Sequence, residues 1–165
     1  KQLLLINLSK GSIGSDGVHL LGSLLITAFA SAGYSRIDTP ENERRNYYLY
    51  LDEFQNYTSG SIANALSELR KFKIGFVLAH QYMFQLSAEI RNAVLGNIGT
   101  IICFKLGQAD AKYMEKEFYP IFEASDFINL AHYHIYLKLL IDGKVSQAFS
   151  AITIQHTALE ERKGF

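Results

Sequence analysis

The chain has 165 residues, a mass of 18.6 kDa, and 16 acidic and 16 basic side chains. Its 48% hydrophobic content excludes disorder for most of the chain, because so much apolar surface can offset the ordering entropy. Zero formal net charge excludes a global positive field, so any contact with nucleic acid must be local. A single cysteine, Cys103, excludes a disulfide framework and favours a reducing, cytosolic setting.

The first third of the chain predicts a strand, a loop and a helix. The apolar run Leu3–Leu8 predicts a strand buried on both faces, and the Gly-rich Ser9–Gly17 predicts a loop. Apolar residues at helical spacing predict an amphipathic helix over Asp16–Tyr34. The most apolar stretch, residues 20–33, is shorter than the ~18–20 residues that cross a bilayer, so we expect no membrane-spanning segment.

The middle of the chain alternates strands with helices. The predicted strands are Tyr47–Leu51, Ile74–Ala79 and Thr100–Leu106, and the predicted helices are Ile62–Phe72, Ser87–Leu95 and Gln108–Phe118. This order predicts an α/β fold with a mostly parallel sheet flanked by helices.

The end of the chain changes character. Tyr133–Ile141 and Val145–Ile154 predict antiparallel strands, and Asp142-Gly143 between them suits a tight hairpin. We expect one core over residues 1–157, followed by a charged tail at 158–165.

Two adjacent carboxylates stand where the second predicted strand ends, at Asp52 and Glu53. The carboxyl edge of a parallel sheet is where such folds bind ligands. One carboxylate, Asp52, suffices to hold Mg²⁺ beside a nucleotide phosphate, and Glu53 could orient or deprotonate an attacking water. The alternative is a strand end capped by solvated acids.

The next strand ends in Ala79-His80-Gln81, and neighbouring strand tips converge on one crevice. We expect Gln81 to reach the same water or phosphate as Glu53, because an amide donates and accepts at once. Arg70 stands at the end of the preceding helix, where a cation complements the helix dipole. A functional alternative makes Arg70 a charge donor to a phosphate, in its own site or in a neighbour's.

These residues resemble a known family. The runs LLLINLSKG, YLYLDEFQNY, ELRKFKIGFVLAHQY and IRNAVLGNIGTIICFKLGQADA resemble the carboxyl-terminal half of the conjugation and type IV secretion ATPases. This family comprises the TraG/TraD-like coupling proteins and their relatives in the FtsK–HerA superfamily. The resemblance covers roughly Leu3–Ile154.

The resemblance implies a RecA-like P-loop NTPase core that hydrolyses ATP with Mg²⁺, as a homo-hexameric ring that moves DNA or protein. It places Asp52 and Glu53 on the family's Walker B acids and Gln81 on its sensing glutamine. Arg70 matches a basic position expected near a phosphate, and Arg91 matches a position where the family often carries Arg. The implied location is cytoplasmic, at the inner face of the membrane if regions outside this chain anchor it.

One part of the family pattern is missing from the 165 residues. They contain no G-x-x-x-x-G-K-[ST] phosphate loop, and Lys10 precedes the glycines of Ser9–Gly17 rather than following them. We therefore expect an upstream segment to carry the phosphate-loop strand, and this chain alone to hydrolyse little or no ATP. The alternative function is a RecA-like module without catalysis that docks partner proteins of a DNA-transfer or secretion complex.

Overall fold

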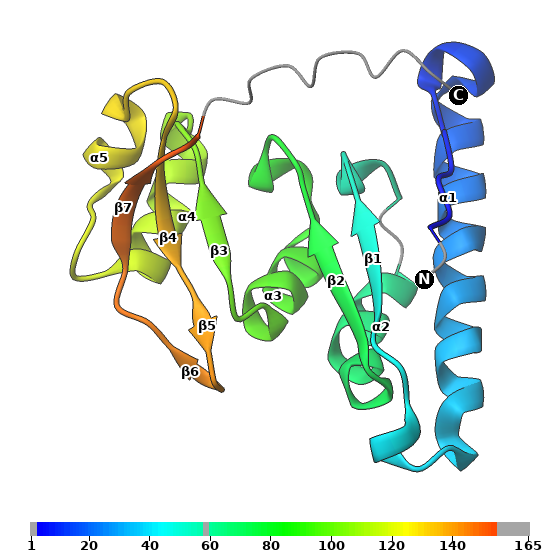
Figure 1. The fold of residues 1–165 in the computed structure, drawn as a ribbon. Helices are drawn as coiled ribbons and strands as arrows, with labels where there is room; N and C mark the ends of the chain where they lie inside the picture. The colour runs from blue at the N-terminus through cyan, green and yellow to red at the C-terminus, as the bar shows by residue number, and fades with distance from the viewer. Residues whose placement is uncertain (1–2, 58–59, 155–165) are drawn as a thin grey trace, which may run out of the picture. The chain divides into compact units, whose positions relative to one another are not determined.

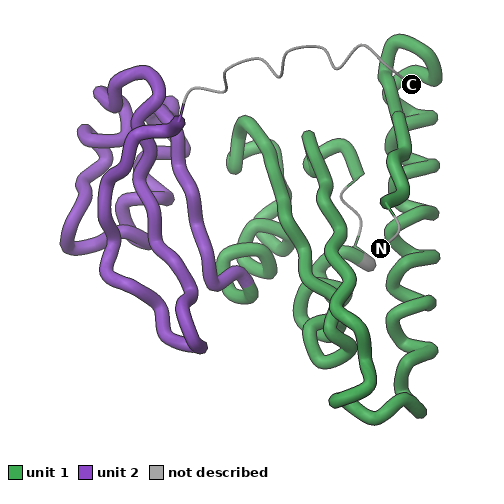
Figure 2. Tube along the Cα trace, viewed as in Figure 1, with its two compact units in different colours: residues 1–97 green, residues 98–165 purple. Residues whose placement is uncertain are grey.

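The computed structural model describes residues 3–57 and 60–154 of the chain. These residues form two compact units, which divide between Asn97 and Ile98 (Figure 2). Each unit has its own sheet and helices. The single core expected over residues 1–157 stays a prediction, and the charged tail at 158–165 lies outside the described residues.

The first unit is built on two parallel strands, β1 (Tyr47–Leu51) and β2 (Ile74–Leu78), shown side by side in Figure 1. Their register runs from Tyr47 opposite Ile74 to Leu51 opposite Leu78. Helix α2 (Gly60–Glu68) and the 3₁₀ helix Leu69–Phe72 connect them. Both strands and the helical crossover between them are therefore confirmed, and their carboxyl ends lie at one edge.

Helix α1 (Lys10–Tyr34) packs a narrow stripe of its surface against the rest of the first unit. Its buried residues recur every three or four positions, as one helix face requires: Val18, Gly22, Ile26, Ala30 and Gly33. Ala30 joins the core around Leu49, Leu69 and Phe72. The helix begins earlier than expected, but Gly14 at φ 72° kinks it, so the regular part starts close to the predicted Asp16.

The helical stretch Lys10–Asp38 is 29 residues long, and an apolar window of 18 residues within it has a mean hydropathy of 1.4. This length and hydropathy are sufficient for a helix that crosses a membrane, but the core helices of soluble proteins also meet both criteria. In this structure its inner stripe packs on protein, while Leu20 and Leu24 are exposed.

The strand predicted over Leu3–Leu8 is wrong: residues 3–9 adopt no regular secondary structure. Leu3 and Leu5 are 84% and 82% exposed. An extended segment becomes a strand only through hydrogen bonds to a neighbour, and residues 3–9 make no such pairing among the residues the structure describes. Instead, residues 3–6 and Leu8 line a cavity of about 1290 Å³ together with residues of α1 and β1.

Helix α3 (Ala88–Asn97) closes the first unit and packs on α2. It starts one residue later than predicted and continues through the expected turn at Gly96-Asn97.

The second unit has an antiparallel sheet in the order β3-β4-β7. Its strands are β3 (Ile101–Cys103), β4 (His134–Lys138) and β7 (Phe149–Ile152). Because β3 takes β4 as its hydrogen-bonded neighbour, it is antiparallel rather than part of a long parallel sheet. The expectation of a mostly parallel sheet is thus corrected: in the described part of the chain, the parallel pairing is confined to β1 and β2.

The carboxyl-terminal hairpin is confirmed. Strands β5 (Leu140–Ile141) and β6 (Lys144–Val145) pair across Asp142-Gly143, whose φ values are 49° and 77°. Two successive positive φ angles match the right-handed twist of the flanking strands.

Two helices cover this sheet, and one of them was not predicted. Helix α4 (Gln108–Phe118) has the predicted bounds, whereas α5 (Ala124–Asn129) was missed. The sequence signal for α5 is a capping box, in which the Glu123 N–H donates to Asp126 Oδ2 at 2.8 Å. Phe118, Phe127 and Tyr136 pack edge to face between the helices and β4.

Candidate functional site

The carboxyl ends of β1 and β2 are joined by backbone hydrogen bonds that continue past the last paired residues. The Ala79 N–H donates to the Leu51 carbonyl at 2.9 Å, and the Phe54 N–H donates to the Ala79 carbonyl at 3.1 Å. Phe54 is fully buried, and its ring packs edge to face against the His80 ring, with the two ring centroids 5.0 Å apart. These contacts fix the two chain segments that leave the sheet.

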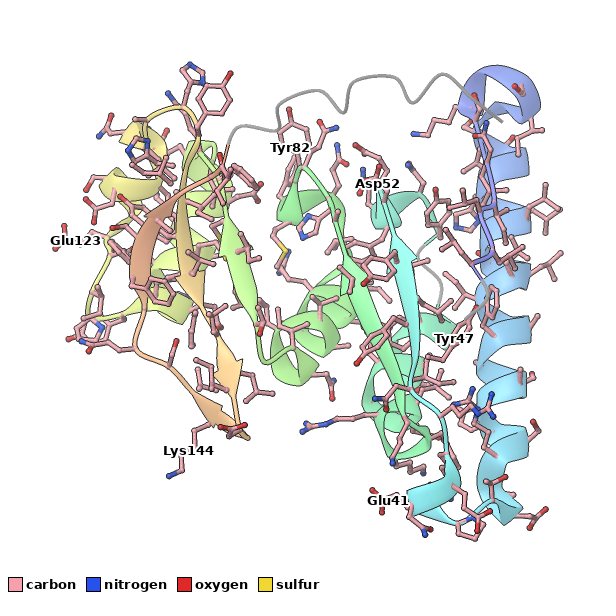
Figure 3. All side chains as sticks on the ribbon, viewed as in Figure 1. Glu41, Tyr47, Asp52, Tyr82, Glu123 and Lys144 are labelled. Atoms are coloured by element: carbon pink, nitrogen blue, oxygen red, sulfur yellow. The ribbon has the colours of Figure 1, made fainter. Side chains whose placement is uncertain are left out.

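Glu53 and Gln81 meet at this edge, as the strand order led us to expect. The Gln81 Nε2 donates to Glu53 Oε1, a contact between residues that are 28 positions apart in the chain. In Figure 3, the labelled Asp52 and Tyr82 mark the two segments at the end of β1 and after β2. The structure therefore brings the glutamate and the amide into direct contact.

Asp52 lies beside this pair with its carboxylate exposed. Its Oδ1 accepts the N–H of Glu53 at 3.0 Å. Glu53 has a φ of 50°, which costs a non-glycine residue roughly 1–2 kcal/mol, so the surrounding turn must hold it there. Part of that restraint is the Asn56 N–H, which donates to the Glu53 carbonyl at 2.9 Å.

Two residues of the 3₁₀ helix Phe54–Tyr57 belong to this site and were not predicted for it. The Gln55 Nε2 donates to Glu53 Oε2 at 2.5 Å. Burial raises the pKa of Tyr57, and the negative charges of Asp52 and Glu53 raise it further. Gln55 and Tyr57 stand two and four residues after Glu53 in the sequence. That spacing indicates a contact with Glu53 only if the chain turns at Glu53, which the sequence does not reveal.

The described residues contain no group of three or more histidine, cysteine or acidic side chains that could hold a metal ion. A hard cation such as Mg²⁺ often takes one or two carboxylates and completes its shell with phosphate oxygens and water. The exposed carboxylate of Asp52 fits that type of site, because its location at a strand end leaves room for the other ligands.

Of the two arginines singled out in the sequence, Arg70 lies away from this edge. Arg70 is exposed on the 3₁₀ helix before β2, so the length of that strand, ~17 Å at ~3.3 Å per residue, separates it from Gln81. Arg91 is half-buried in the first turn of α3, where its N–H donates to the Ser87 carbonyl at 2.9 Å. The sheet edge with Glu53 and Gln81 thus does not contain Arg70, whereas a role for Arg91 at that edge stays a prediction.

The first unit is therefore an α/β unit, with two parallel strands joined by a helical crossover. Its polar residues lie at the carboxyl ends of these strands, which is where α/β proteins commonly bind ligands. By sequence, the chain matches no family profile and no curated protein. By fold, it is similar to structures of the bacterial conjugative coupling protein TrwB.

The TrwBdeltaN70 structure in its trigonal form, in complex with sulphate, has a TM-score of 0.63 and 16% identity and covers 79% of this chain. TrwB in complex with the non-hydrolysable GTP analogue GDPNP, and TrwB in complex with ADP and Mg²⁺, each have a TM-score of 0.61 and cover 83%. The chain spans 36% to 38% of the length of these structures. The α/β fold expected from the resemblance to coupling proteins is therefore confirmed.

Proposed function

We propose that the chain is part of an ATP-hydrolysing motor that moves DNA, or protein, in conjugation or type IV secretion. The observation that carries the proposal is the hydrogen bond from Gln81 to Glu53 beside Asp52, at the carboxyl edge of β1 and β2. The TrwB structures lend support, since that protein was obtained with ADP and Mg²⁺, with ADPNP and with GDPNP.

Each side chain then has a role set by its chemistry. Asp52 would hold Mg²⁺, which would neutralise phosphate charge. Glu53 accepts a proton from the attacking water as the water oxygen bonds to the γ-phosphorus and the bond to the bridging oxygen breaks, giving ADP and phosphate. Gln81 senses the terminal phosphate, because its amide can donate to a phosphate oxygen and accept from water.

Arg70 suits a neighbouring subunit's site in a homo-hexamer better than its own. It is exposed, and β2 separates it from Gln81 within the chain. A guanidinium supplied by an adjacent subunit is a common source of charge on a transferred phosphoryl group. Arg91 is a second phosphate-contact candidate, since it lies in the helix that follows the Gln81 loop.

A phosphate loop from an upstream segment completes this proposal. Directly before and after β2, the Lys73 carbonyl accepts the Tyr47 N–H and the Ala79 N–H donates to the Leu51 carbonyl. In a parallel pair the backbone groups of alternate residues face opposite edges, so those of Ile74, Phe76 and Leu78 point away from β1. No strand of the described residues pairs there. To that edge we assign the strand that leads to the phosphate loop. The motor would work on the cytoplasmic side, with other secretion or conjugation components as partners.

The test is Glu53→Gln in the full-length protein that contains this chain. The substitution keeps the shape of the side chain and removes its capacity to take a proton, so ATP turnover should be lost while nucleotide binding is retained. The matched control is Glu43→Gln, because Glu43 is an exposed glutamate in the segment before β1, far along the strand from Glu53. Undiminished turnover in Glu53→Gln would contradict the role of Glu53, whereas an unsubstituted full-length protein without ATP turnover would contradict the motor and favour the docking-module function.

A further inference from the structure

We propose that Gln55 is a positioning residue, which keeps the Glu53 carboxylate in place when Gln81 leaves it to contact the nucleotide. The inference rests on the proposed function. It starts from two hydrogen bonds that the Glu53 carboxylate accepts. Oε1 accepts an amide N–H of Gln81, and Oε2 accepts an amide N–H of Gln55 at 2.5 Å.

The two amides differ in how they are attached. Gln55 belongs to the 3₁₀ helix that begins directly after Glu53, and the buried ring of Phe54 anchors that helix. The left-handed backbone at Glu53 folds the chain so that the side chain two residues later reaches back to the carboxylate. Gln55 therefore moves with Glu53 as one rigid turn.

Gln81 comes from a different segment of the chain. It is exposed and lies in the segment after β2, before the 3₁₀ helix Met83–Gln85. Its contact with Glu53 joins residues 28 positions apart, whereas Gln55 and Glu53 are two positions apart. Of the two donors, Gln81 is the one that can move without rebuilding the turn.

This difference assigns separate tasks to the two oxygens. A carboxylate with an amide on each oxygen offers the attacking water a poorer acceptor than one with a free oxygen. When Gln81 moves to the terminal phosphate, Oε1 becomes available for the proton of the water. Oε2 stays fixed by Gln55, so the carboxylate does not rotate away from the reacting water.

The test uses Gln55→Met in the full-length protein, because methionine keeps the length of the side chain and lacks the donor. We expect kcat to fall about tenfold, in the range of lost positioning interactions, while KM and nucleotide affinity stay within about twofold. Gln55→Glu, which replaces the donor by a second carboxylate, should lower kcat at least as much. Gln108→Met is the matched control, because Gln108 is exposed and lies in the second unit, outside the unit that carries Glu53.

A second measurement does not depend on turnover. Carbodiimide modification of Glu53, followed by peptide mapping of the nucleotide-free protein, reports how freely its carboxylate oxygens can react. Modification should become several-fold faster in Gln55→Met and, as a positive control, in Gln81→Met, but not in Gln108→Met.

Parental kcat in both Gln55→Met and Gln55→Glu, or an unchanged modification rate at Glu53, would overturn the proposal. These outcomes are separable from failure of the proposed function. If Glu53→Gln retained full turnover, the function would fall, while the modification rate would still decide whether Gln55 holds the carboxylate.

Discussion

Gly22 links helix α1 to the turn that carries the site. A Cβ atom at this position would lie 2.3 Å from Cδ1 and 3.0 Å from Cγ of the Tyr57 ring. A ring cannot yield to such a contact as the end of a flexible side chain can, so Gly22→Ala must displace Tyr57 or the helix. Overpacking of this kind costs about 1–3 kcal/mol.

A matched substitution isolates that cost. Gly17 lies in the same helix, and a Cβ there would meet Ile13 at 3.4 Å, an ordinary contact. Both Gly17→Ala and Gly22→Ala gain about 1 kcal/mol of helix propensity, so their difference leaves the steric cost of about 1–3 kcal/mol. That difference corresponds to about 5- to 150-fold in the opening equilibrium of the helix.

The assay is hydrogen exchange of the peptides that cover α1 and residues 52–57, since exchange reports local opening free energies. Gly22→Ala should lose protection in both regions, and Gly17→Ala should keep or gain it in α1. Equal protection in the two variants would refute the packing of Tyr57 on Gly22. Tyr57→Ala in the Gly22→Ala background should restore protection in α1, because the clashing ring is gone.

Two further predictions concern the second unit. Burial raises the pKa of the Cys103 thiol from 9.0 to about 12, so iodoacetamide should modify it slowly in the folded protein and quickly after unfolding. The unfolded thiol ionises near 9.0 and the folded one near 12, so its contribution to stability is present below pH 9 and is lost as the pH rises toward 12. Gly143→Ala should destabilise the hairpin by roughly 1–2 kcal/mol in urea unfolding, because Gly143 has a φ of 77° with open space around it. Gly96→Ala, which also has open space but no positive φ, should cost nothing by comparison.

Elements with a strong local pattern could be predicted from the sequence. The bounds of α4 and of β1 follow from periodicity and from the polar residues around them, and Asp142-Gly143 specifies its own turn. Leu3–Leu8 shows the limit of this reasoning. Its apolar run is typical of a buried strand, but a strand also needs a hydrogen-bonded neighbour, which a local pattern does not reveal.

The candidate site divides in the same way. The contact of Glu53 with Gln81 follows from strand order, because the carboxyl ends of neighbouring parallel strands lie at the same edge of the sheet. The contact of Gln55 with Glu53 depends on a left-handed φ at a glutamate, which no propensity rule predicts for that residue type. The separation of Arg70 from this edge became clear only from the structure, in which its 3₁₀ helix lies at the other end of β2.

The most direct test of the central claim is an experimental structure of the full-length protein with Mg²⁺ and a non-hydrolysable ATP analogue. The account predicts that Asp52 coordinates the metal ion directly or through water, that Glu53 faces the terminal phosphate, and that the Gln81 amide has moved onto that phosphate. A nucleotide bound away from the ends of β1 and β2, or a Glu53 and Gln81 turned away from it, would contradict the account.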